Sequence, residues 1–171
     1  MKKKSIRSIV YVLVFFLNWW KSYFMIYNIS YRDRTTIRKI NETIGSPFGL
    51  IQRLKMKGIG SPRFILNTSS EDIDKRLPSD ESSVKISIEL RPNGIIVHFK
   101  KFMEHYSWII PYYKLSIYYS DNFSIYSDSS FIKISKDNLR KPHIKFIKKL
   151  INLKAEFSKN YITWVPYLNK N

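Results

Sequence analysis

The sequence predicts an α+β fold: a small antiparallel sheet or partly open barrel, closed by a C-terminal amphipathic helix and preceded by an N-terminal helical arm. Between residues 83 and 135, apolar and polar residues alternate in short runs interrupted by turn residues, which is typical of half-buried antiparallel strands. Residues 137–158 then carry apolar side chains at helical spacing among lysines. With 44% apolar and 16% aromatic residues, a chain of 171 residues can form a packed core.

The clearest strand pair surrounds a turn at residues 92–94. Apolar residues alternate with polar ones from 84 to 91, so one face of this strand should be buried and the other, with Glu89 and Arg91, should face water. Pro-Asn-Gly supplies a fixed φ followed by residues that tolerate positive φ. Residues 95–100 then return as the partner strand.

Four shorter runs follow along the chain. Residues 106–110 are rich in β-branched and aromatic side chains up to Pro111, which cannot donate to a sheet and therefore implies an edge or a bend. Residues 115–119, 123–126 and 131–134 alternate again, with polar turns between them. Strands that follow one another so closely favour a meander or a small barrel.

The C-terminal helix is expected to cover the open end of the sheet. Asp137 or Asn138 can cap it, and Pro142 is acceptable in a first turn. The apolar residues expected to face the sheet are Ile144, Ile147, Leu150, Ile151 and Phe157.

These segments together resemble a known family. A Trp lies near the middle of the strands (YSWIIPYYKLSIYY, 106–119), a short final strand follows (FIKIS, 131–135), and one helix closes the run (HIKFIKKLINLKAEF, 143–157). Over about half of the chain this pattern resembles the pleckstrin-homology-like domains of small uncharacterised bacterial proteins. The resemblance implies a barrel-like sheet plugged by a helix, on a scaffold that binds lipids, peptides or proteins and seldom catalyses. Fold alone does not define function.

The net charge of +17 is concentrated on both sides of the predicted sheet. Residues 1–70 hold 13 basic and 2 acidic side chains, and residues 133–171 hold 10 basic and 2 acidic ones. Such a surface can bind the anionic lipids of a membrane or the phosphates of a nucleic acid. Alternatively the lysines only solvate the surface, in a composition rich in Lys, Ile, Asn, Tyr and Ser that is typical of an AT-rich genome.

Two basic segments are candidate binding sites. Residues 31–44 predict a short helix ending at Gly45, and residues 50–57 predict a second one with Leu50, Ile51 and Leu54 on one face. We expect that apolar face to pack on the sheet, although a basic amphipathic segment can also lie on a membrane or dock a partner. The candidate residues for contact with an anionic surface are Arg53, Lys55, Lys57, Lys145, Lys148 and Lys149.

The N-terminus decides the expected location. Three lysines and Arg7 precede nine apolar residues, 9–17, and extending this run to residue 27 reaches the length of a membrane anchor. Alternatively translation starts at Met25, in which case the protein is cytoplasmic, and a third interpretation is that the segment is an ordinary buried helix. The expected organisation is therefore a hydrophobic segment (1–27), a basic and partly helical arm with a polar loop (28–82), the sheet with its helix (83–158) and an aromatic tail (159–171).

Catalytic and metal-binding motifs are not found in the sequence. The chain has no cysteine, and His98, His105 and His143 form no ligand pair. We therefore expect no enzyme, no cofactor, no metal and no small-molecule substrate. A catalytic function would require a closed pocket that brings His98 or His105 together with carboxylates.

The expected function is a non-catalytic binding or scaffold module that acts on an anionic membrane surface or a protein partner. The alternative is a small basic nucleic-acid-binding protein, with outward tyrosines for base stacking. Alternation places Tyr118 outward and Tyr119 inward, with Leu115 and Ile117. If the two basic segments converge around outward tyrosines, nucleic acid is favoured; if they flank an apolar N-terminal helix on one side, a membrane is favoured.

Overall fold

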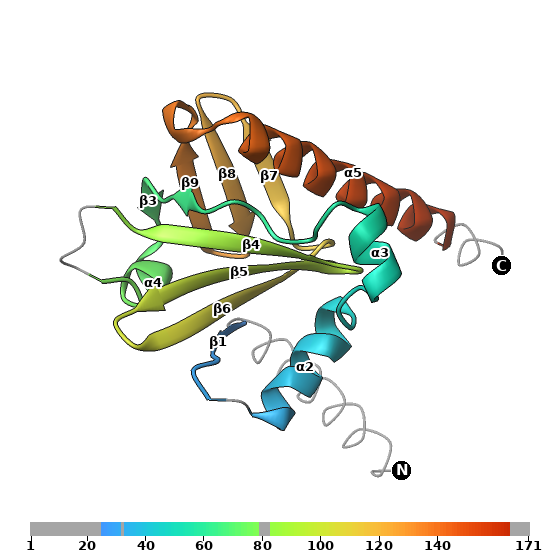
Figure 1. Ribbon diagram of the computed structural model, residues 1–171, viewed down its shortest axis with the longest axis horizontal. Coiled ribbons are helices and arrows are strands. Elements are labelled where there is room, and N and C mark those ends of the chain that lie inside the picture. The colour runs from blue at the N-terminus through green and yellow to red at the C-terminus, as the bar shows by residue number, and fades with distance from the viewer. Residues whose placement is uncertain (1–24, 32, 79–82, 165–171) are drawn as a thin grey trace, which may run out of the picture.

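The computed structural model describes residues 25–31, 33–78 and 83–164, with the last four residues described by their backbone alone. It confirms an α+β fold with antiparallel sheets and a C-terminal helix (Figure 1). There are two sheets in the described part, and they are not closed into a barrel. The expectations for residues 1–24 lie outside the described residues.

The larger sheet has five strands in the order β1-β6-β5-β4-β2. All neighbouring strands are antiparallel, and β5 is central and buried on both faces along its first four residues. The strands are Ile26–Asn28 (β1), Phe64–Ile65 (β2), Lys85–Arg91 (β4), Gly94–Lys101 (β5) and Glu104–Pro111 (β6).

The smaller sheet has four antiparallel strands in the order β3-β9-β8-β7. Pro111 ends β6, and the turn that follows it leads from the larger sheet to the smaller one, so the bend expected at this proline is confirmed. The strands are Thr68–Ser69 (β3), Ser116–Tyr119 (β7), Asn122–Ser127 (β8) and Ser130–Ser135 (β9).

The β4–β5 hairpin differs from the expectation in its backbone. Arg91 pairs with Gly94 as predicted, but neither Asn93 nor Gly94 is among the described residues with positive φ. Positive φ occurs instead at Phe102 and Asp128, in the two-residue loops of the β5–β6 and β8–β9 hairpins. β6 begins at Glu104, two residues before the strand predicted over 106–110, so the β5–β6 connection is only two residues long.

The main core lies between the two sheets and α5 (Lys141–Trp164). Ile86, Ile88 and Leu90 contribute from β4, which confirms the alternation predicted for that strand. α5 contributes Phe146, Ile147 and Leu150.

α5 begins later than expected. Asp137 and Asn138 lie in a 3-10 turn (Lys136–Asn138) that Ser135 caps, and the α-helix starts at Lys141. Ile144 and Ile151, which were expected to face the sheet, are exposed. The buried face of α5 is centred on residues 146, 147 and 150. The stripe of α5 that contacts the core is therefore narrower than the apolar pattern suggested.

α2 (Arg34–Ile44) covers the opposite face of the five-stranded sheet. Asp33 caps its first turn by accepting from the backbone amides of Thr35 and Thr36, and the helix ends at Gly45 as predicted. Ile40 and Ile44 pack on Ile96 and Ile109 in a second apolar cluster. The face of β4 expected to be wet is therefore half-buried under α2.

The polar loop expected in the arm contributes to the core instead, over its described residues 67–78. It forms β3 and a one-turn helix, α4 (Glu71–Asp74), and it buries Ile73 and Leu77. β1 and β2 also extend the larger sheet, so the arm expected before the sheet forms strands of both sheets.

Candidate functional site

The apolar face of α3 (Leu50–Lys55) points to solvent. Leu50, Ile51 and Leu54 are 75%, 70% and 70% exposed, and none of the residues of α3 is buried. The expectation that this face packs on the sheet is therefore wrong. Single exposed leucines are ordinary, but three on one helical turn form a continuous apolar patch that is normally covered by a partner.

Residues beside the helix, rather than its own apolar face, attach α3 to the domain. Phe48 precedes α3, and Met56 and Ile59 follow it, and all three pack against the main core. The chain then runs along β4, where the Leu90 amide donates to the Ile59 carbonyl at 2.9 Å. Because these neighbours supply the packing, the apolar stripe of α3 is left unpartnered among the described residues.

Lys149 joins α3 to α5 across 93 residues of sequence. Its Nζ donates to the carbonyl oxygens of Met56 at 2.6 Å and Gly58 at 2.7 Å, just beyond the C-terminal end of α3. Partial burial lowers the pKa of Lys149, and the nearby charge of Lys145 lowers this pKa further. Of the six predicted contact residues, Lys149 is thus the one that holds the two basic segments together.

The other five predicted cations are exposed around the apolar stripe. At about 100° per residue, Arg53 and Lys55 flank the stripe on opposite sides of α3. Arg53 donates through Nε to the Phe48 carbonyl at 2.7 Å, and Lys57 follows the helix at a φ of 52°. Lys145 and Lys148 lie on the face of α5 that also carries Lys149. We call these nine residues the α3–α5 surface: Leu50, Ile51, Arg53, Leu54, Lys55, Lys57, Lys145, Lys148 and Lys149.

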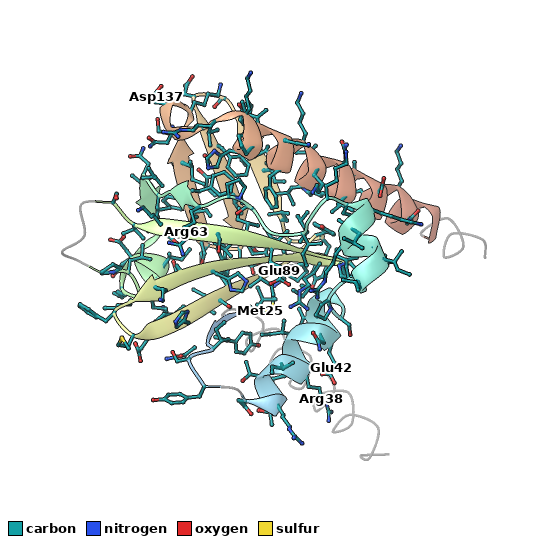
Figure 2. The ribbon with its side chains drawn as sticks, in the orientation of Figure 1. Met25, Arg38, Glu42, Arg63, Glu89 and Asp137 are labelled. Carbon is teal, nitrogen blue, oxygen red and sulfur yellow. The ribbon has the colours of Figure 1, made fainter. Side chains whose placement is uncertain are left out.

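A second polar group lies on the larger sheet beneath α2 (Figure 2). Nδ1 of His98 is 2.9 Å from the Ser107 Oγ, and Nε2 of His98 is 3.3 Å from Glu89 Oε2. The other Glu89 oxygen accepts from the Arg91 Nε at 2.7 Å. Sequence reasoning singled out His98 but missed its partners, because strand register is needed to place Ser107 directly opposite it.

This group borders a half-open cavity of about 320 Å³ between α2 and the sheet, so His98 does meet a carboxylate near a cavity. A serine next to a histidine that contacts a carboxylate is also the arrangement of a nucleophile, its general base and the group that orients the base. However, Ser107 is only 1% exposed, and Arg91 neutralises Glu89. The arrangement therefore satisfies the polar groups that α2 covers, as buried charges require.

Stability should fall in acid partly through Glu89. Burial raises the pKa of Glu89, but hydrogen bonds and charge from His98 and Arg91 outweigh it and leave this pKa below the ordinary value of 4.5. Its contribution to folding is therefore present above that value and is lost as pH falls through the lower folded-state pKa. In urea unfolding between neutral pH and about pH 3, Glu89→Gln should lose less stability than the wild type. Equal losses would contradict this role of Glu89.

Two of the exposed tyrosines are consecutive residues on β7 of the smaller sheet. Tyr118 is exposed as predicted, but Tyr119, expected inward, is exposed as well. β7 is an edge strand of the smaller sheet, and the Nζ of Lys136 lies over the Tyr119 ring at 4.8 Å. Tyr112, by contrast, is buried against Phe157.

Comparisons with protein-family models, curated proteins and solved structures found no match. Within residues 25–31, 33–78 and 83–164, no helix is both long enough and apolar enough to cross a bilayer. In the same residues, no three histidine or acidic side chains gather in a way that could hold a metal ion.

Proposed function

We propose that the protein is a non-catalytic binding module that attaches to anionic membrane surfaces through the α3–α5 surface. The observation that carries the proposal is the exposed apolar stripe of α3 with cations on both sides. An amphipathic segment of this kind lies at a bilayer interface, with aliphatic side chains among the acyl chains and lysines near the headgroups. The sequence of residues 1–24, with its basic head and nine apolar residues, supports the same location.

The kind of apolar residue favours a membrane over a nucleic acid. The two basic segments flank Leu50, Ile51 and Leu54, which are aliphatic, whereas binding of single-stranded nucleic acid relies on aromatic side chains that stack on bases. Lysines around exposed aliphatic residues match the two components of an anionic bilayer, its charge and its hydrocarbon.

The pleckstrin-homology-like assignment belongs to this proposal. Antiparallel strands that change sheets after Pro111, followed by one long C-terminal helix, support it. The open arrangement of the two sheets differs from the closed barrel that the resemblance implies. Such a scaffold is suited to binding rather than to catalysis, in agreement with the buried position of Ser107.

Removing two lysines of α5 should weaken binding to anionic vesicles. The double variant Lys145→Gln and Lys148→Gln is expected to bind vesicles of equimolar phosphatidylglycerol and phosphatidylcholine about thirtyfold more weakly than the wild type. The reason is that each lysine near an anionic surface contributes about 1 kcal/mol. Flotation with these vesicles, in the full chain, measures the affinity.

The matched control removes the same charge elsewhere. Lys133 and Lys136 lie in β9 and the 3-10 turn, and Figure 2 shows the neighbouring Asp137 at the start of α5, away from α3. Lys133→Gln with Lys136→Gln should therefore keep most of the affinity. If the two double variants lost affinity equally, the effect would depend on net charge alone and the proposed surface would be overturned. A wild-type protein that does not bind anionic vesicles would overturn it as well.

A further inference from the structure

The β5–β6 hairpin exposes a second apolar pair at its tip. Phe102 is 72% exposed and Met103 is 88% exposed, and these two residues form the whole loop between Lys101 and Glu104. β5 pairs with β4 only as far as His98. From Phe99 to Lys101, β5 pairs with β6 alone. The tip therefore lies at the end of the larger sheet where β5 and β6 turn (Figure 1).

The backbone at the tip does not suit the residue that occupies it. Phe102 has a φ of 52°, in the left-handed region that bulky side chains rarely adopt and that favours glycine. Its ring gains little packing there, because most of it is in solvent. An aromatic residue held in an unfavourable conformation and exposed to water points to a role outside folding.

Cations surround the base of the tip. Lys100 is exposed, and the Nζ of Lys101 donates to the Lys75 carbonyl at 2.8 Å, which brings the base of the tip next to the residue that follows α4. Arg76 follows Lys75 in that segment. Four described carboxylates lie in the same region, and each has a partner: Glu71 pairs with Lys75, Asp72 accepts from the Ser130 hydroxyl, Asp74 accepts from the Ser69 hydroxyl at 3.1 Å, and Glu104 accepts from the Tyr106 hydroxyl at 2.6 Å.

We propose that the β5–β6 tip is a second bilayer contact, in which Phe102 and Met103 enter the interface of an anionic membrane while Lys100 and Lys101 lie at its headgroups. An apolar tip with basic residues at its base complements the hydrocarbon and the charge of such a bilayer. This contact is separate from the α3–α5 surface, because α3 lies beside the end of β4 at Leu90 and the eight residues of β5 span about 25 Å between the two ends. The inference extends the proposed function to another part of the molecule.

The test uses a dye that reports its local environment. The chain has no cysteine, so Met103→Cys offers a single attachment point for the environment-sensitive fluorophore NBD in the full-length protein. With vesicles of equimolar phosphatidylglycerol and phosphatidylcholine, the emission of the dye at residue 103 is expected to shift to the blue and to increase. The same dye at Asn138→Cys, an exposed polar position, should not respond.

Two further variants separate the possible failures. A dye at Leu54→Cys reports on α3: if it responds and the dye at residue 103 does not, the tip inference is overturned while the proposed function stands. If residue 103 responds alone, the tip inference stands and the α3–α5 surface fails; if neither responds, both fail. Phe102→Gly, added to Met103→Cys, should reduce the response without lowering the melting temperature, because glycine suits the backbone there. An undiminished response in this variant would also overturn the inference.

Discussion

Replacing Gly94 with alanine is expected to destabilise the protein by about 3 kcal/mol. A Cβ at this position would lie 2.4 Å from the Ile110 carbonyl oxygen and 2.6 Å from Cγ2 of Ile44. The first of these atoms belongs to the backbone of β6, which cannot move without disturbing the central strand pair. Urea unfolding followed by circular dichroism measures the loss.

The matched control is Gly60→Ala, since a Cβ at Gly60 meets nothing within 4 Å and the residue does not have positive φ. Its unfolding free energy should stay within about 0.5 kcal/mol of the wild type. Adding Ile44→Ala to Gly94→Ala should not restore stability, because the closer atom, the Ile110 oxygen, remains in place. If Gly94→Ala had the same unfolding free energy as the wild type, the close approach of Ile110 and Ile44 to Gly94 would be contradicted.

Replacing the apolar stripe of α3 with glutamine should remove most of the affinity for anionic vesicles. The triple variant Leu50→Gln, Ile51→Gln and Leu54→Gln is expected to bind about a hundredfold more weakly, at about 1 kcal/mol for each partly buried aliphatic side chain. Its melting temperature should be unchanged, because these side chains contribute no core contacts and glutamine is a good helix former. Flotation and thermal unfolding of the full chain give the two measurements.

The control for this variant removes exposed apolar surface elsewhere. Tyr113 and Tyr118 are 64% and 59% exposed, and Tyr113→Gln with Tyr118→Gln should leave the affinity for vesicles unchanged. If the tyrosine variant lost as much affinity as the triple variant of α3, the tyrosines would have to be part of the binding surface. Retained affinity in the triple variant would contradict the role assigned to α3.

Regular alternation made the long strands predictable. β4 alternates over seven residues, and its turn carries Pro92 and Asn93, so the strand, its buried face and its hairpin could all be derived from the sequence. β1, β2 and β3 are only two or three residues long, which is too short for a periodic pattern. They were therefore missed, and with them the division into two sheets.

Amphipathic patterns predicted the helices but not the direction that each one faces. The stripe of α3 looked like a packing face, yet Phe48, Met56 and Ile59 supply the packing and leave the stripe exposed. The contact of Arg91 on β4 with Asn41 of α2 was missed for the same reason, since spacing within one strand cannot show what lies above it. Contacts between distant segments, such as Lys149 with Met56, depend on the whole topology.

The most direct test of the central claim is the fluorescence of NBD attached at Leu54→Cys in the full-length protein. If α3 enters the interface of an anionic bilayer, the emission shifts to the blue with vesicles of equimolar phosphatidylglycerol and phosphatidylcholine. The shift should be weaker with phosphatidylcholine alone, and it should diminish in the Lys145→Gln and Lys148→Gln variant. Emission that stays unchanged with anionic vesicles, in a protein that remains folded, would contradict the account.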